Sequence, residues 1–510
     1  METVNPVLPL PGPYKPSIPK PPQPIVRWVL GVSLCLGVAC DCLLRGGPWG
    51  FNVTCFAGLL SLVIAWGWHR HTEHAPCWTL LLLLFFFSMG VAWRENLALT
   101  SLNLGTMGIL LLILNARPTR SNLNSAPLYT LMVNSKYALG RIIAAPIRLL
   151  GYDMDWSQSI PRLRCAPSKS VLRALLLTAP LLVVFTWLFA SADAIFNHAL
   201  ESMGTLVNQL IDQSQTCLTH TLWSLLFGLL IIMILHPVAL GKRWKPAVAT
   251  PPATFAVGQL ETATVLGTLL LLFLCFIGIQ LRYLFGGTDL VQNVAGLTYA
   301  DYARHGFFAL LKVVLLLHIV LMAGGWLVKE SDEATQRLFA RLSLGLIALT
   351  IFIFVSAFFR LSLYVGAYGL TRARLYAASV LVWLALVFML MALKLMRPNW
   401  NNFTGAYLYA FMGVLALLNI SNPDGVITRV NLDRYVAGKT LDWGYMTSLS
   451  QDAIPTLLQY EGTLTKADMT TMVEEFRSHH TFEAPQSWRG WHYGRSRARR
   501  LINRFSDTPP

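Results

Sequence analysis

The sequence predicts an all-α protein, a polytopic bundle of about eleven membrane-spanning helices followed by a small C-terminal helical unit outside the membrane. The chain has 510 residues, is 55% hydrophobic and has a mean hydropathy of +0.52. Only 13% of its residues are charged, whereas ordinary soluble domains carry about 25%. Long apolar segments recur along most of the chain, and a polar stretch follows the last one. A water-soluble fold cannot bury so much apolar sequence, so these observations predict a membrane protein.

The N-terminal arm, residues 1–24, is rich in proline. Proline disrupts helix and sheet interiors, so the composition predicts a disordered cytoplasmic segment. The arm has no short apolar core with a small-residue cleavage site, so the first span is expected to remain as an anchor.

The apolar segments define the predicted spans, since crossing about 30 Å of hydrocarbon takes roughly twenty helical residues. Four spans are expected within residues 25–115 and seven within residues 171–420. The segments are 26–44, 51–68, 78–93, 97–115, 171–190, 217–238, 261–285, 306–328, 339–365, 374–396 and 402–420.

Basic residues predict the orientation of these spans. Lys and Arg concentrate in the N-terminal arm and in the even-numbered connections, which places the N-terminus in the cytoplasm. With eleven spans, the C-terminal region then lies on the extracytoplasmic side.

Residues 116–170 are too long for a simple connection and mix apolar residues with Lys136, Arg141 and Arg148. This pattern predicts an amphipathic helix at the cytoplasmic surface, bound to anionic lipid headgroups. A cytoplasmic protein partner is the alternative.

Beyond residue 420 the composition resembles that of a soluble protein. Residues 421–485 are predicted to form a small helical extracytoplasmic unit, in which Thr465 and Asp468 resemble a helix-capping pair. Residues 486–510 are interpreted as a basic tail, either solvated or in contact with anionic lipid.

Several function classes are not supported by the sequence. It contains no phosphate-binding loop, dinucleotide-binding motif, GxSxG or HExxH. The net charge of +15 is explained by basic cytoplasmic connections, so no nucleic-acid partner is expected. The eight cysteines form no CxxC pair, and the spacing of His69, His71 and His74 matches no familiar ligand pattern. Neither a metal nor a cofactor is expected.

Ionisable residues within the predicted spans include Asp41, Lys312 and His318. Such residues usually face a bundle interior or cavity and indicate function. Asp41 and Lys312 lie near span ends and are alternatively able to reach the interface. For His318 a neutral, hydrogen-bonded role is the simpler interpretation.

Polar residues also cluster in the connections after the fifth, seventh, ninth and eleventh spans. Odd-numbered connections share one side of the membrane, whatever the orientation. A polar cluster is therefore predicted at the outward surface, with the members Asp193, His198, Tyr299, Asp301, Arg304, His305, Arg360, Tyr364, Tyr368, Arg372, Asp424, Arg429 and Asp433.

Two interpretations of this cluster remain open. In the structural one, acids and arginines pair to hold loops and the helical unit together. In the functional one, arginines bind phosphate or carboxylate groups while Asp and His transfer protons.

The stretch RLSLYVGAYGLTRARLYA, residues 360–377, spaces arginines and tyrosines four residues apart. The rise of a helix per residue, counted from the start of the ninth span, places Arg360 at the outer membrane boundary, where its side chain can extend to water. Tyr364 and Tyr368 then fall among the headgroups. Gly366 and Gly369 predict a break between two helices.

Four further stretches belong with this one: SADAIFNH (191–198), GLTYADYARHGFF (296–308), SNPDGVITRVNLDRY (421–435) and LDWGYMTSLSQDAIPTL (441–457). Together the five stretches resemble an uncharacterised bacterial family of multi-pass membrane proteins. It is the domain-of-unknown-function family 4173, which is related to family 4153. The resemblance implies a bacterial inner-membrane location and helical spans. It supplies no catalytic residue and no substrate.

Three functions remain compatible with the sequence. The first is transport or translocation through an outward-facing polar site, or another envelope-related role. The second is a membrane enzyme acting on a lipid-linked phosphate or glycan. The third is a non-catalytic sensor or assembly subunit with a protein partner in the membrane or envelope.

Overall fold

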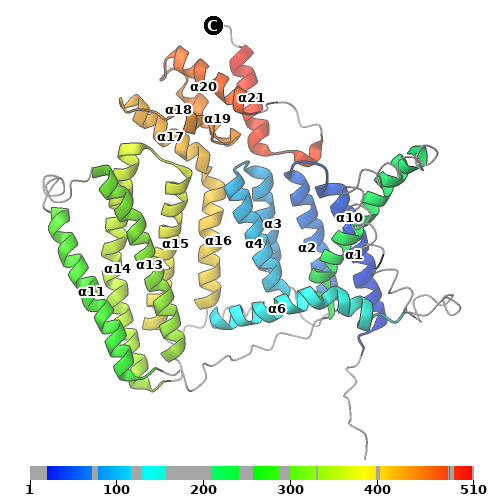
Figure 1. Cartoon of the computed structure of the whole chain (residues 1–510), viewed down its shortest axis with the longest axis horizontal. Coiled ribbons are helices and arrows are strands. Elements are labelled where there is room, and N and C mark those ends of the chain that lie inside the picture. Colours follow the sequence, from blue (N-terminus) through cyan, green and yellow to red (C-terminus); the bar gives the residue numbers. More distant parts are fainter. Residues whose placement is uncertain are drawn as a thin grey trace, which may run out of the picture. The chain divides into compact units, whose positions relative to one another are not determined.

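A computed structural model describes residues 20–71, 78–115, 128–156, 208–240, 257–285, 299–328, 331–397, 403–480 and 487–507, together with residues 178 and 482. Every regular element in these ranges is a helix (Figure 1), which confirms the predicted all-α class. Nine helices in the described ranges are long and apolar enough to cross a membrane, and α3 is a shorter apolar helix.

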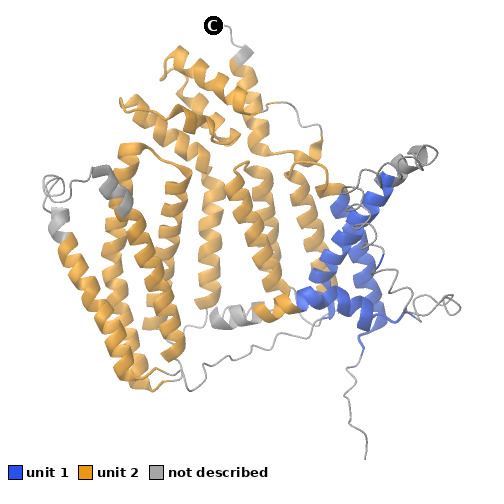
Figure 2. Cartoon of the chain, viewed as in Figure 1, with its two compact units in different colours: residues 1–41, 141–242 blue, residues 42–140, 243–510 orange. Residues whose placement is uncertain are grey.

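The chain divides into two compact units (Figure 2). One comprises Met1–Asp41 and Arg141–Lys242, and the other comprises Cys42–Gly140 and Arg243–Pro510. The second unit contains most of the apolar helices and all of the C-terminal region.

Ten helices coincide with predicted spans, and α10, α13 and α14 extend beyond the predicted N-terminal ends. They are α1 (Gln23–Leu44), α2 (Phe51–His71), α3 (Trp78–Trp93), α4 (Leu97–Asn115), α10 (Asn208–Leu240), α11 (Gln259–Phe285), α13 (Tyr299–Leu327), α14 (Glu333–Tyr368), α15 (Arg372–Met396) and α16 (Phe403–Ser421). The predicted segment 171–190 lies outside the described residues, so the total of eleven spans stays a prediction.

Local sequence explains where α14 begins and ends. Asp332 caps its N-terminus, where the carboxylate accepts a hydrogen bond from the backbone N–H of Thr335. At the other end, Gly369 has a φ of +79°, and its N–H donates to the carbonyl of Val365 at 2.8 Å. A positive φ favours glycine because it has no Cβ. The predicted break within residues 360–377 is therefore confirmed.

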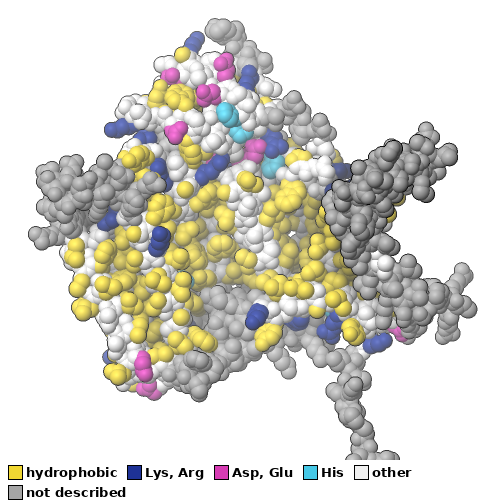
Figure 3. Space-filling view, in the orientation of Figure 1, with side chains coloured by type: hydrophobic (Ala, Val, Ile, Leu, Met, Phe, Trp, Pro, Cys, Tyr) yellow, Lys and Arg dark blue, Asp and Glu magenta, His cyan; other side chains and the backbone are white. Residues whose placement is uncertain are grey.

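Helices α11, α13, α14 and α15 share one apolar core, which includes the fully buried Phe307, Val314, Leu346 and Leu381. Their outward faces are apolar as well (Figure 3). Ile351 on α14, for example, is 59% exposed. Large exposed apolar surfaces indicate contact with lipid or another protein, which agrees with a membrane-spanning bundle.

The C-terminal region forms a helical unit that we term the C-terminal cap. It comprises α17 (Pro423–Val436), α18 (Trp443–Thr447), η5 (Gln451–Ala453), α19 (Ile454–Leu457), η6 (Leu458–Tyr460), α20 (Lys466–His479), η7 (Trp488–Gly490) and α21 (Tyr493–Asp507). Ile427, Leu449, Phe476 and Ile502 are fully buried in its own core. The predicted helix-capping pair is confirmed at the N-terminus of α20, because the Thr465 hydroxyl accepts a hydrogen bond from the N–H of Asp468 at 3.1 Å.

The interpretation of residues 486–510 as a solvated tail is wrong for much of that segment. Residues 493–507 form α21, and Ala498 and Ile502 are fully buried in the core of the C-terminal cap. Arg497 and Arg500 lie on its exposed face. The helix is amphipathic, so its few apolar residues dock on the cap although its composition is basic.

The C-terminal cap lies at one end of α2–α4 and α14–α16 (Figure 1). The N–H of Phe51, the first residue of α2, donates to the carbonyl of Trp491 at 3.0 Å. The Phe51 ring also packs edge-on against Trp488 and Trp491. Side-chain contacts therefore join the cap to the start of α2.

In the other unit, α1 crosses α10 at small residues. A Cβ at Gly37 would overlap the carbonyl oxygen of Ser224, so the two helices approach closely only because glycine is present. Near the C-terminal end of α10, Nε2 of His236 lies 2.7 Å from Oδ2 of Asp153.

The predicted amphipathic segment 116–170 contains α6 (Leu128–Arg148), which includes Pro146. Lys136 is exposed on this helix. Contact of this segment with anionic lipid headgroups stays a prediction. The predicted N-terminal arm lies outside the described residues, apart from the beginning of α1 and the residues just before it.

Candidate functional site: a buried carboxylate junction

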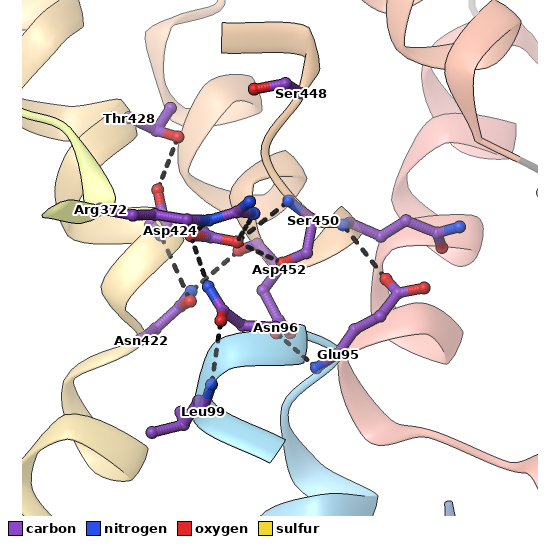
Figure 4. Close-up of polar contacts among 12 residues, drawn as sticks. Glu95, Asn96, Leu99, Arg372, Asn422, Asp424, Thr428, Ser448, Ser450 and Asp452 are labelled. Carbon is purple, nitrogen blue, oxygen red and sulfur yellow. Dashed lines mark hydrogen bonds and ion pairs between the residues drawn. The ribbon is translucent and has the colours of Figure 1, made fainter. Parts of the chain in front are cut away.

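The densest polar arrangement among the described side chains lies where the C-terminal cap meets the ends of the apolar helices (Figure 4). We term it the Asp424 junction. Its members are Glu95, Asn96, Arg372, Asp424, Ser450 and Asp452.

Asp424 occupies the first turn of α17, where the partial positive charge of the helix N-terminus favours a carboxylate. Asn422 caps this helix with a φ of 57°, and Pro423 follows as its first residue. Both residues favour a helix start at this position. The local sequence thereby places Asp424, which is fully buried, against the ends of α4 and α15.

Arginine and asparagine side chains bind the carboxylate of Asp424. Arg372 donates from Nε to Oδ1 at 2.8 Å and from Nη2 to Oδ2 at 2.6 Å. Asn96 donates from Nδ2 to Oδ1 at 2.8 Å. This two-point contact between a guanidinium and a carboxylate is among the strongest polar interactions in proteins.

Ser450 supplies the remaining hydrogen bonds to the Asp424 carboxylate. Its backbone N–H donates to Oδ2 at 3.0 Å and its hydroxyl donates to the same atom at 2.5 Å. An ionised carboxylate offers about four acceptor positions. The side chain of Asp424 is therefore saturated, and it holds three chain segments together.

Asp452 is the second buried carboxylate of the junction, with 2% of its surface exposed. Oδ2 accepts from the N–H of Glu95 at 2.8 Å, while Oδ1 has no hydrogen-bond partner among the described residues. Burial raises the pKa of Asp452 from 3.8 to about 7, although the N–H of Glu95 and the charge of Arg94 oppose the shift. The charges of Glu95 and Asp424 raise this pKa further.

Glu95 connects the junction to α21. Its Oε1 accepts from Nε of Arg495 at 3.1 Å and from Nη2 at 2.8 Å. Its Oε2 accepts from the N–H of Gln451 at 3.1 Å. The adjacent Arg94 donates to the carbonyls of Asn419 and Ile420 at 2.7 and 3.0 Å. The short α3–α4 connection therefore contacts both α16 and the cap.

Four residues of the predicted outward cluster lie outside the Asp424 junction. Arg360 is buried and donates to Oε1 of Gln280 at 3.1 Å. The expected extension of Arg360 to water is therefore wrong, because α11 and α13 enclose it. Asp433 accepts from the Tyr460 hydroxyl, while the side chain of Arg429 is exposed. Tyr368 is exposed at the end of α14.

Tyr364, unlike Tyr368, is buried, with 7% of its surface exposed. It therefore does not contribute to the expected aromatic belt. The side chains of the remaining predicted members are not described by the structure. Asp193 and His198 fall in an undescribed segment, and only the backbone is described for Tyr299, Asp301, Arg304 and His305.

The polar residues within the apolar helices differ in their surroundings. Asp41 is buried and pairs with Nδ1 of His220. Lys312 is exposed on α13, so it does not face the bundle interior. His318 is buried, and its Nε2 lies 3.2 Å from the Tyr407 hydroxyl. No group of three potential metal ligands occurs among the described residues.

Sequence reasoning did not select Glu95, Asn96, Ser450 or Asp452. A signal was present for the first two, because the connection 94–96 is odd-numbered and therefore shares the side of the ninth and eleventh connections. Ser450 and Asp452 lie in the stretch 441–457 that carries the family resemblance, but nothing local set them apart from the other polar residues of that stretch.

A family model described as Domain of unknown function (DUF4153) matches residues 79–460. The chain belongs to this family. The matched range includes all six members of the Asp424 junction and ends before Arg495. Within this DUF4153 protein, the family region therefore holds the junction but not α21. No curated protein and no solved structure matches the chain.

Proposed function

We propose that this DUF4153 protein is a non-catalytic subunit of the bacterial inner membrane that presents its C-terminal cap to an envelope protein on the extracytoplasmic side. The orientation is supported by the distribution of Lys and Arg among the connections. The bacterial location rests on the resemblance to the related family 4173.

One observation favours a structural role for Asp424 over a catalytic one: the acceptor positions of its carboxylate are filled by Arg372, Asn96 and Ser450. A general base needs a free acceptor within reach of a substrate proton. A carboxylate that is fully buried and saturated instead fixes the cap on the ends of the helices. The structural interpretation of this part of the predicted cluster is therefore the better supported one.

Removal of one partner from a buried ion pair leaves an uncompensated charge, so the attachment of the cap depends on the pair. A cap held in one orientation presents a constant surface, which suits recognition of a protein partner. Lys439 and Lys466 are exposed on this surface and provide amines for cross-linking.

The test is co-purification of the full-length protein from its native membrane in a mild detergent, after amine cross-linking. We expect a protein partner in stoichiometric amount, with cross-links to Lys439 or Lys466. Arg372→Gln should release this partner, while Arg337→Gln, which breaks an exposed ion pair on α14, should not. Recovery of a lipid-linked glycan or phosphate without any protein would contradict the proposal and favour an enzyme.

Proton-linked transport is a second candidate, and His318 is the observation that favours it. The ring stacks on Tyr407 and lies edge-on to Trp383 and Phe388. Its Nδ1 has no partner among the described residues. A histidine deep in a span with an unused ring nitrogen is suited to bind and release a proton.

Proton uptake into proteoliposomes tests this second candidate. His318→Gln should abolish uptake, whereas Tyr407→Phe should alter its pH profile because the ring then loses its hydrogen-bond partner. Equal uptake by wild type and His318→Gln would remove His318 from any transport mechanism.

A further inference from the structure

Two arginines from different helices converge on the C-terminal end of α14. Arg434 of α17 donates from Nε and Nη2 to the carbonyl of Gly366 at 3.2 and 3.1 Å, and from Nη2 to that of Ala367 at 2.9 Å. Arg374 of α15 donates from Nη1 to the carbonyl of Gly369. A Cβ at Gly369 would lie 2.8 Å from Nη1 of Arg434, so glycine is needed for this approach.

The charge of this pair is not balanced by an acid. No ion pair to a carboxylate is formed by Arg374 or Arg434 in the part of the chain that the structure describes. The helix C-terminus contributes only about half a negative charge. Burial, followed by the positive charge of Arg374, lowers the pKa of Arg434. The two guanidinium groups therefore repel each other and attract an anion.

Both guanidinium groups keep donors that bind nothing among the described residues. Arg374 uses Nη1 alone, which leaves its Nε and Nη2. Arg434 uses Nε and Nη2, which leaves its Nη1. Arginine donors in this arrangement suit a phosphate, whose oxygens accept several hydrogen bonds at once.

Aromatic side chains border the arginine pair. The guanidinium carbon of Arg374 lies 3.8 Å from the ring centre of Tyr364 and 5.9 Å from that of Tyr368. Tyr368 is 53% exposed. Tyrosine at the end of a spanning helix is typical of the headgroup layer, where lipid phosphates are the most abundant anions.

We propose that Arg374 and Arg434 bind the phosphate of an anionic membrane lipid at the end of α14, with Tyr368 beside the lipid glycerol. This site is separate from the Asp424 junction and goes beyond the proposed function. The ligand class is a phosphodiester headgroup without its own cation, because an attached ammonium would face two positive charges.

Native mass spectrometry of the delipidated full-length protein tests the assignment, with phosphatidylglycerol as the probe. Phosphatidylcholine and inorganic phosphate distinguish an anionic lipid from a zwitterionic lipid and from a free ion. The double variant Arg374→Gln, Arg434→Gln should weaken binding of phosphatidylglycerol about tenfold or more. Arg500→Gln makes a single neutralisation on the exposed face of α21 and should leave binding unchanged.

Tyr368→Glu tests the site without removal of either arginine, in case the double variant does not fold. The new carboxylate lies beside Arg374 and competes with the phosphate, so binding of phosphatidylglycerol should fall while the thermal midpoint is kept. Unchanged binding in both the double variant and Tyr368→Glu would overturn the proposal. Displacement of the lipid by an equal concentration of inorganic phosphate would overturn its assignment to a lipid.

Discussion

Arg372 binds Asp424 through two hydrogen bonds of 2.8 and 2.6 Å, across 52 residues of sequence. The pair joins the first residue of a spanning helix to the first turn of the C-terminal cap. Asp424 is fully buried, whereas the Arg372 side chain is 32% exposed. The acid therefore depends on the arginine more than the arginine depends on the acid.

Arg372→Gln should destabilise the attachment of the cap by about 3 kcal/mol, because it leaves the buried charge of Asp424 without its cation. The measurement is the thermal midpoint in detergent, together with limited proteolysis between α16 and α17. Arg337→Gln on the exposed face of α14 is the control, since exposed ion pairs contribute little. Equal midpoints for Arg372→Gln and the control would contradict the prediction.

Asp452 should make the stability of the cap depend on pH. Its pKa is raised to about 7 in the folded protein from 3.8, so the folded state binds this proton more tightly than the unfolded chain. Stability therefore falls as pH rises from about 4 to about 7, by at most about 4 kcal/mol. Thermal midpoints between pH 5 and 8 should decrease for wild type.

Asp452→Asn should flatten this pH dependence, because an amide does not titrate. Asp433→Asn, at an exposed carboxylate of the same cap, should retain it. A wild-type midpoint that rises over this pH range would show that Asp452 is not the group that controls it.

Gly494→Ala should displace the start of α21. A Cβ at Gly494 would overlap Oδ1 of Asp452, and the carbonyl oxygen of Trp93 would lie 3.4 Å away. Overpacking of this kind costs about 1–3 kcal/mol in the free energy of unfolding. Gly444→Ala is the control, because the nearest atom to its Cβ is Oδ1 of Asp442 at 3.8 Å, an ordinary contact. A Gly494→Ala variant as stable as the control would contradict this packing.

Asn103 and Asn419 should couple α4 to α16. Their side chains exchange hydrogen bonds of 2.8 and 2.9 Å, and both are buried. Replacement of each by leucine, singly and together, defines a double-mutant cycle of unfolding free energies. We expect a coupling energy of about 0.5–1.5 kcal/mol, the range for hydrogen bonds between helices in membranes. Additive single effects would show that the pair contributes no coupling.

The spans were predictable because the bilayer imposes a length on apolar sequence. Apolar runs predict spans at residues 78–93 and 97–115, and these coincide with α3 and α4. Arg360 shows where this reasoning fails. The predicted depth of Arg360 considers one helix alone. In the structure its guanidinium lies between helices, bound to Gln280 of α11 and in the space that Gly306 of α13 leaves free.

The partners in the Asp424 junction were not predictable in the same way. The local sequence around a polar residue in a connection is the same whether its side chain lies in water or is buried against a distant segment. Asn96 and Asp424 are separated by 328 residues, so no local pattern connects them. The prediction of a solvated tail after residue 486 is wrong for a similar reason, because Ala498 and Ile502 are buried only against the completed cap.

The amino-acid sequence alone determined that this protein is helical, that apolar helices recur along it and that a polar helical unit follows them. These properties follow from hydropathy, which acts through the solvent around each segment. The tertiary structure decided which charges are buried, that Arg372 pairs with Asp424, and that Arg374 and Arg434 converge on one helix end. These outcomes depend on contacts between distant segments, and a buried charge is tolerated only where such a contact supplies its partner.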